Sequence, residues 1–189
     1  MWRLLVVMIK ELSPKADLEV LAAQEPELER RVLSLHARRG QDLYGFAVGL
    51  GLCDADAADA VQEAMLRLWR ELESGRDVRD LDAWAFRTTY HLVMDHHRLR
   101  RRLVASFERL TARGTSNATD PADSSDAAAL WQAVDGLPAR QRAVLYLRYR
   151  ADLPFERIGL VLGITPSAAR SHSTQALANL RRRVGPEES

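Results

Sequence analysis

Arginine and hydroxyl side chains gather near the C-terminus, in a stretch that is typical of a helix from Pro166 to about Val184. Arginine can read guanine, glutamine can read adenine, and serine or threonine can contact either bases or phosphates. Three arginines at the far end of the helix, at positions 181–183, are suited to phosphate contacts. The stretch therefore predicts a DNA-contacting helix, with outward candidates Ser167, Arg170, Ser171, His172, Thr174 and Gln175 and phosphate contacts from Arg181, Arg182 and Arg183.

A second set of chemically capable side chains lies at 91–102, in the sequence HLVMDHHRLRRR. Its polar residues are expected on one face of a long helix, and Trp84, Phe86 and Tyr90 lie just upstream. Arginines mixed with aromatic rings can follow a nucleic-acid strand and stack on unpaired bases. The simpler reading for Trp84, as for Trp69, is that it fills a core.

The charged residues are unevenly distributed along the chain. The net charge is only +1. Residues 54–82 nevertheless carry nine acids against four arginines. Two later blocks are basic: residues 86–113 carry seven arginines against two acids, and residues 136–184 carry nine arginines against two acids. The pattern favours two modules that each present a polyanion-binding surface, although solvated helix faces would give similar blocks. A single cysteine, Cys53, excludes an internal disulfide framework and a multi-cysteine metal site.

Helical periodicity covers most of the chain, so we expect an all-α fold of two small helical domains. Helices are predicted at 27–38, 41–52, 57–72 and from 81 to 102 or beyond, with Asp54 or Asp56 as the cap of the third. Inward positions are Val61, Met65, Leu68, Trp69 and Leu72 in the third helix, and Trp84, Ala85, Thr88, Leu92 and Met94 in the fourth.

The second domain ends in a helix-turn-helix. Helices are predicted at 139–150, 155–162 and from Pro166 onward, after a short helix near Leu130. Gly163 suits the left-handed turn, Gly159 permits close helix approach, Ile164 is expected in the core, and Thr165 is expected to cap.

The boundaries follow from composition. Residues 1–26 form an unassigned N-terminal extension, 27–110 the first domain, 111–126 a flexible acidic linker, 127–184 the second domain and 185–189 a tail. The apolar start, Met1 to Ile9, is too short to span a membrane and does not match a secretory signal. We expect a cytoplasmic protein with no membrane insertion, no cofactor and no metal.

Two motifs carry a family resemblance. Residues 59–69, DAVQEAMLRLW, resemble the acidic signature of region 2 of bacterial RNA polymerase sigma factors, and Leu137-Pro138 with Gln141-Arg142 and the helix-turn-helix resembles region 4. The short linker resembles that of the extracytoplasmic-function (ECF) group. The resemblance implies a sigma factor that binds core RNA polymerase, directs it to promoters and helps to open the DNA.

The resemblance also implies residue roles. The helix at 57–72 would dock on the polymerase β′ clamp, and region 4 would touch the β flap and read the −35 element through Ser167, Arg170, Ser171, Thr174, Arg181 and Arg182. Loop 74–80 and helix 81–102 would capture the −10 strand. The implied polymerase contacts are Asp59, Gln62, Glu63 and Arg67, and the implied −10 contacts are Arg76, Arg79, Arg87, His91, Asp95, Arg98, Arg101 and Arg102.

Two departures and two alternatives remain. His91 stands where relatives often have asparagine. Ser173 stands where a large apolar residue is common, so looser packing is expected around Ser173. An operator-binding regulator would explain the helix-turn-helix but not the 59–69 motif. A metalloenzyme built on His91, Asp95 and His96 is disfavoured because only two of these ligands share a helix face. Many ECF relatives are held by an anti-sigma partner, and the sequence identifies none.

Overall fold

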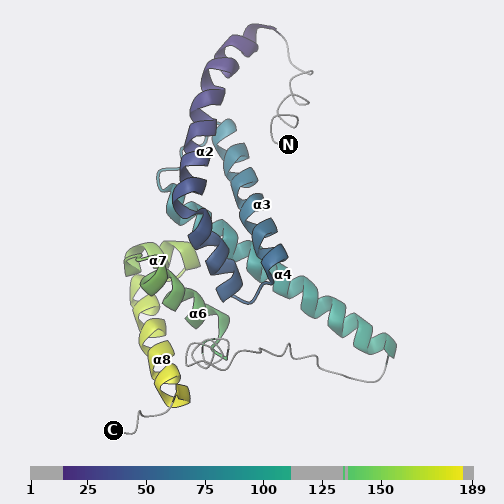
Figure 1. The fold of residues 1–189 in the computed structure, drawn as a ribbon, viewed down its shortest axis with the longest axis vertical. Helices are drawn as coiled ribbons and strands as arrows, with labels where there is room; N and C mark the ends of the chain where they lie inside the picture. Colours follow the sequence, from purple (N-terminus) through teal and green to yellow (C-terminus); the bar gives the residue numbers. More distant parts are fainter. Residues whose placement is uncertain (1–14, 112–133, 135, 185–189) are drawn as a thin grey trace.

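The computed structural model describes the backbone of residues 15–111, 134 and 136–184, and the side chains of 27–103, 134 and 136–183. Three long helices form the first module: α2 (Lys15–Gly49), α3 (Asp54–Glu73) and α4 (Leu81–Thr111). The second module contains α6 (Ala139–Leu145), the π-helical turn η2 (Tyr146–Arg150), α7 (Phe155–Leu162) and α8 (Pro166–Val184). No strand occurs within the described ranges, which confirms the all-α prediction (Figure 1). The proposed linker, apart from Thr111, and the tail lie outside the described residues.

The first helix is longer than predicted. Instead of two segments at 27–38 and 41–52, one helix runs continuously from Lys15 to Gly49 and includes Pro26. Proline removes one backbone donor, but the alanine, leucine and glutamate residues around it have high helix propensity. The expected inward positions Val32, Leu35, Leu43 and Phe46 are all buried.

Helix α3 confirms its predicted apolar stripe but not its predicted cap. Val61, Met65, Leu68 and Leu72 are buried, while Trp69 is half-buried. The N-cap is Cys53 rather than Asp54 or Asp56, and its side chain makes no capping bond. Both aspartates instead lie in the first turn, where their negative charge still stabilises the helix dipole.

Helix α4 confirms only part of the face that we predicted to be buried. Ala85 is fully buried as expected, whereas Trp84, Thr88, Leu92 and Met94 are only half-buried. The most buried large side chains are instead Phe86 and Val93, which are fully buried, and Tyr90, which is 7% exposed. The prediction that Phe86 and Tyr90 stack on bases is therefore wrong. Phe86 instead packs edge-on against Phe46 of α2, with ring centroids 5.5 Å apart. Aromatic residues placed near arginines cannot be separated from core residues without knowing the partner helix.

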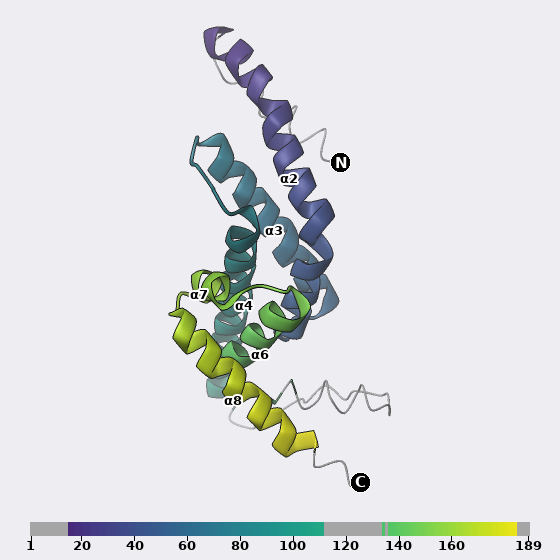
Figure 2. The same ribbon diagram turned by 90° about the vertical axis from the view of Figure 1, so that its left-hand side faces the viewer.

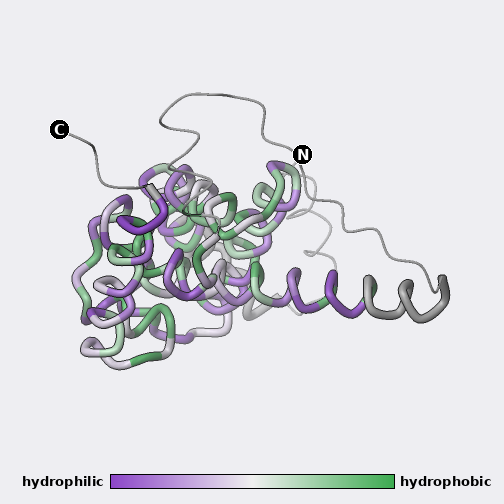
Figure 3. The backbone as a smooth tube through the Cα atoms, turned by 90° about the horizontal axis from the view of Figure 1, so that it is seen from below, coloured by the Kyte–Doolittle hydropathy of each residue, from purple (hydrophilic) through white to green (hydrophobic). Residues whose placement is uncertain are grey.

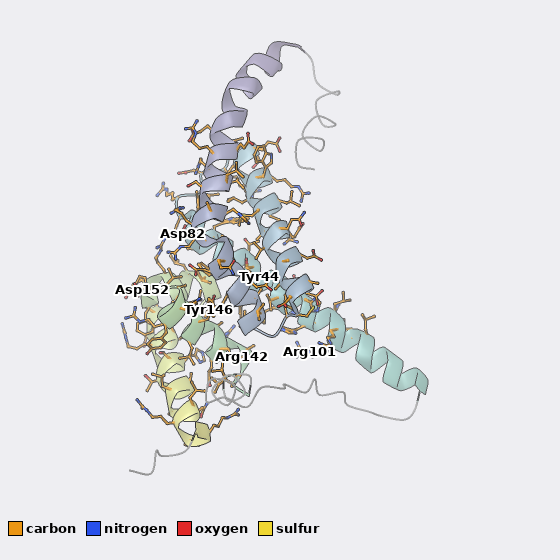
Figure 4. All side chains as sticks on the ribbon, in the orientation of Figure 1. Tyr44, Asp82, Arg101, Arg142, Tyr146 and Asp152 are labelled. Carbon is orange, nitrogen blue, oxygen red and sulfur yellow. The ribbon has the colours of Figure 1, made fainter. Side chains whose placement is uncertain are left out.

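The two modules pack against each other. One continuous apolar core extends from α2, α3 and α4 through Val144, Leu147, Ile158 and Val161 of the second module. Figure 2 shows α6 and α7 between α8 and the first three helices, and Figure 4 shows Tyr146 and Arg142 where the second module meets α2. From the sequence we expected two separate domains, because the spacing of apolar residues within each module does not indicate that the two modules share an interface.

Candidate nucleic-acid and polymerase interface

The outward face of α8 carries most of the predicted DNA-reading side chains. Ser167, Arg170, Ser171 and Thr174 are all exposed, and they recur at i, i+3, i+4 and i+7, so they share one helix face. Gln175 is exposed as well, while His172 is half-buried and Ser173 is only 3% exposed. Ser173 belongs to the packed side of the helix, and His172 is less available for DNA than the sequence suggested.

The turn before α8 forms as predicted. Gly163 adopts a left-handed conformation with φ 65°, which ends α7 at low steric cost. A Cβ on Gly159 would lie 2.7 Å from the backbone oxygen of Ile164, so only glycine permits this approach. The Thr165 hydroxyl accepts a hydrogen bond from the Ala168 amide at 3.1 Å and caps α8. These contacts fix the angle at which α8 presents its exposed face.

The far end of α8 is basic. Arg181 and Arg182 are exposed in the last turn, where positive charge also stabilises the helix dipole. Arg182 hydrogen-bonds Asn179, and Arg183 donates to the carbonyl of Gly136 at 2.8 Å. Arg183 is thereby tied to the start of its own module.

The polymerase contacts implied by the resemblance lie on the outer face of α3. Asp59, Gln62 and Arg67 are exposed and Glu63 is half-buried, whereas Ala60, Val61 and Ala64 between them are buried. Arg67 donates to Glu63 at 2.8 Å, one turn away. The four residues form one polar surface that a partner protein can reach.

The residues implied for the −10 strand extend over loop 74–80 and along α4. Several of the arginines are paired with nearby carboxylates: Arg76 with Glu71 at 2.8 Å, Arg79 with Asp77 at 3.3 Å, and Arg98 with Asp95 at 2.7 Å. Arg87, His91, Arg101 and Arg102 are exposed. The C-terminal half of α4 projects away from the other helices, and its described part is mainly hydrophilic (Figures 1 and 3).

A cavity of about 290 Å³ lies between α3 and α4. It brings together residues that the sequence had assigned to two different partners, since Arg67 was expected to contact polymerase and His91 to contact DNA. The cavity offers two guanidinium groups and an indole beside the single carboxylate of Glu71, which suits an aromatic group that carries hydrogen-bonding atoms. Its lining comprises Arg67, Arg70, Glu71, Trp84, Thr88 and His91.

Polar contacts between the modules were not predicted from the sequence. The Tyr146 hydroxyl donates to the carbonyl of Asp42 at 2.9 Å, and burial raises the pKa of Tyr146. Arg142 donates to the carbonyl of Leu50 at 3.2 Å, and His97 also contacts that oxygen at 2.9 Å. The two contacts between the modules join residues 92 and 104 positions apart, and no local motif predicts them.

Asp80 has two roles at the start of α4. Its carboxylate accepts a hydrogen bond from the Ala83 amide at 3.0 Å, which is an N-cap, and it binds Arg157 of α7 through both oxygens, one at 2.8 Å from Nε. Arg157 holds the pKa of Asp80 below its ordinary value, and the carboxylate raises the pKa of Arg157. The N-cap of α4 could have been predicted from the aspartate that precedes Leu81. The ion pair with Arg157 in the second module could not have been predicted in this way.

Neither a metal cluster nor a membrane span is found in the part of the chain that the structure describes. No group of three or more histidine, cysteine, aspartate or glutamate side chains is placed to hold a metal ion there. Likewise, none of the described helices is long and apolar enough to cross a membrane.

The arrangement defines a class: a two-module helical protein whose second module presents a helix-turn-helix. Two family models match it in order, Sigma-70 region 2 over residues 35–103 and Sigma-70 region 4 over residues 133–182, and together they cover more than half of the chain.

Curated relatives point the same way. The ECF RNA polymerase sigma factor SigL of Mycobacterium tuberculosis is 29% identical over 163 residues, covering 85% of this chain and 90% of the relative. The sigma factor SigV of Bacillus subtilis is 23% identical over 148 residues, covering 78% and 87%. The ECF sigma factor SigE of Mycolicibacterium smegmatis is 30% identical over 151 residues, but the match covers only 57% of that longer relative.

Solved structures share the fold. The sigma factor RpoE of Bartonella quintana, in complex with the anti-sigma factor NepR, matches with a TM-score of 0.68 at 19% identity, covering 84% of this chain and 99% of that one. CnrH, in complex with the cytosolic domain of CnrY, matches with a TM-score of 0.57 at 24% identity, covering 82% and 87%.

The chain belongs to the sigma-70 family of RNA polymerase sigma factors, in its ECF group. As such it is a transcription initiation factor that binds core RNA polymerase and directs it to promoter DNA. An operator-binding regulator is not favoured, because region 2 is present as well as the helix-turn-helix.

Proposed function

We propose that the three polar surfaces divide the work of a sigma factor among themselves. The α3 surface (Asp59, Gln62, Glu63, Arg67) docks on the polymerase β′ clamp. Loop 74–80 and α4 capture the −10 strand, and the exposed face of α8 reads the −35 element while its module touches the β flap. The observation that carries this proposal is the set of Ser167, Arg170, Ser171 and Thr174, exposed together on one face of a capped helix after a glycine turn.

The domain boundaries and the cellular setting belong to the same proposal. Residues 27–110 act as the polymerase- and −10-binding domain, 111–126 as a linker and 127–184 as the −35-binding domain, without catalysis by either. The protein acts in the cytoplasm. An anti-sigma factor is a further partner in this proposal, because the RpoE structure with the same fold contains the anti-sigma factor NepR.

Binding at both elements requires the modules to separate. The two element names differ by 25 base pairs, which corresponds to about 85 Å of duplex. Here Arg157 binds Asp80 of loop 74–80, and it lies two residues after Phe155, whose ring centroid is 5.0 Å from the guanidinium carbon of Arg170. The arrangement described is therefore that of the protein away from its promoter, and polymerase binding must offset the loss of the interface.

Three sets of variants test the assignments. Asp59→Ala with Gln62→Ala should weaken capture by core polymerase, because both side chains are exposed on the docking surface; Glu73→Ala, exposed on the same helix, is the control. Arg98→Ala with Arg101→Ala should impair promoter opening and spare polymerase binding. Arg170→Ala should lower −35 recognition by about 1–3 kcal/mol.

The measurements are pull-down with core enzyme and run-off transcription from a promoter identified by sequencing transcripts after overexpression. Equal loss of polymerase binding and promoter opening in the Arg98/Arg101 variant would contradict the division of roles. A tight footprint on a palindromic operator without polymerase would instead identify a conventional regulator.

A further inference from the structure

Two arginines from different segments lie over one aromatic ring in the second module. Phe155, the first residue of α7, is half-buried and packs against the shared core. The guanidinium carbon of Arg170, on α8, lies 5.0 Å from the ring centroid, and that of Arg148, in η2, lies 5.3 Å from it. Both distances fall within the range of cation–π attraction. The ring thus brings together charges from two segments that are 22 positions apart.

A ring orients an arginine without using its hydrogen-bond donors. A carboxylate occupies one or more of the five guanidinium N–H groups, whereas a ring face attracts the charge and leaves these donors available at the edge. Among the described residues, no carboxylate lies within ion-pair distance of Arg170, whereas Arg76, Arg79 and Arg98 each pair with a carboxylate. Arg170 therefore has an ordered position and keeps its donors for another molecule.

Arg148 is held from two sides. Its Nη1 donates to the carbonyl of Leu153 at 3.2 Å, and its guanidinium also lies over the ring. The ring itself is anchored, because Pro154 before it has extended backbone and Leu153 is buried. A leucine at position 155 could fill the same apolar space but offers no π-face. Phe155→Leu therefore removes the interaction of the ring with the arginines and keeps an apolar side chain in the core.

We propose that Phe155 is a positioning residue for DNA binding, and that it holds Arg170 and Arg148 together as one cationic surface on which Arg170 keeps its guanidinium donors. Arg148 is then a DNA contact beside the α8 face, for a phosphate or a base edge. This inference rests on the proposed role of α8 at the −35 element. It assigns to Phe155 no contact with DNA of its own.

The first test measures the geometry in the free full-length protein. Ring currents shift the NMR signals of side-chain groups that lie over an aromatic face, so the Nε–Hε resonances of Arg148 and Arg170 should both move in Phe155→Leu. They should remain close to wild type in Phe155→Tyr, which keeps the ring. The matched control is Tyr149→Leu, which removes an exposed aromatic side chain from the same module. Unchanged arginine signals in Phe155→Leu would overturn the proposal.

The second test measures DNA binding by the full-length protein assembled with core polymerase. The probe is the duplex that the wild-type holoenzyme enriches from a randomised pool. Each ordered arginine is worth about two- to fivefold in affinity, so Phe155→Leu should bind this duplex about four- to 25-fold more weakly. Phe155→Tyr and Tyr149→Leu should both stay within twofold of wild type.

A triple variant separates positioning from a merely structural role. If Phe155 acts through the arginines, Phe155→Leu should cost less than twofold when added to Arg148→Ala with Arg170→Ala. A full loss in that background would show that the ring only supports the fold, and would overturn the inference. Failure of the wild-type holoenzyme to enrich any sequence would instead refute the proposed function, so the two failures are distinguishable.

Discussion

The effect of Gly45→Ala on stability is expected to depend on the residue at position 146, and to be more favourable when that residue has no hydroxyl group. Gly45 lies inside α2, where alanine is favoured over glycine by about 0.5–1 kcal/mol. A Cβ at position 45 would, however, lie 2.5 Å from the Tyr146 hydroxyl oxygen, and the next nearest ring atom, Cζ, would be 3.5 Å away. The conflict is therefore with the hydroxyl group alone.

The tyrosine cannot move away without cost. Its hydroxyl donates to the carbonyl of Asp42, and its ring lies 5.4 Å from that of Phe46. Displacing the hydroxyl loses a hydrogen bond with a net contribution of about 0.5–1.5 kcal/mol. In the wild-type background the net effect of Gly45→Ala should therefore lie between a stabilisation of about 0.5 kcal/mol and a destabilisation of about 1 kcal/mol. In Tyr146→Phe, where the hydroxyl is absent, it should stabilise by about 0.5–1 kcal/mol.

A double-mutant cycle measured by urea unfolding of the full-length protein gives the coupling, which should be about 0.5–1.5 kcal/mol. Gly40→Ala is the control, because its Cβ would meet only the side chain of His36 on the same helix. It should have the same effect in both backgrounds. If Gly45→Ala stabilised both backgrounds equally, Tyr146 would not lie against α2, and the packing between the modules would be wrong.

Two further predictions concern caps and charge. Asp80→Asn should keep the N-cap of α4, because asparagine caps well, but it should lose the ion pair with Arg157. Because both side chains are about one-third exposed, the free energy of unfolding should fall by only about 0.2–1 kcal/mol at neutral pH. Since folding lowers the pKa of Asp80 from its ordinary 3.8, this stabilisation is complete above that value and is lost as the pH falls below it, so wild type and Asp80→Asn should converge in acid unfolding titrations. Thr165→Ala should lower the free energy of unfolding by about 1 kcal/mol, while Thr165→Ser should largely keep it, as measured by urea denaturation.

Much of the fold could be predicted because its causes are local. Apolar residues at helical spacing place α3 and α8, and a glycine followed by threonine and proline marks the turn between α7 and α8. The exposed face of α8 followed from the same periodicity. The assignments of polymerase and DNA contacts stay predictions, although the structure leaves nearly all of these side chains exposed.

The sequence predictions were wrong where contacts with a segment far away in the chain determine the local structure. The apolar face of α4 is broad, and only packing against α2 determines that Phe86 and Tyr90 point inward while Trp84 lines a cavity. The sequence predicted one α-helix over residues 139–150. The last part of this segment, Tyr146–Arg150, is π-helical instead, and the Ala151 amide donates to the carbonyl of Tyr146 at 3.1 Å. A change of hydrogen-bond register within a helix leaves no periodic mark in so short a segment.

By itself, the sequence determined the helices, the helix-turn-helix and the division into two modules, because propensity, caps and apolar spacing act between residues a few positions apart. Only the tertiary structure decided that Tyr146 meets α2, that Arg157 binds Asp80, and that Phe155 lies under two arginines. Each of these contacts needs a particular angle between helices, and that angle depends on how all the buried side chains pack together.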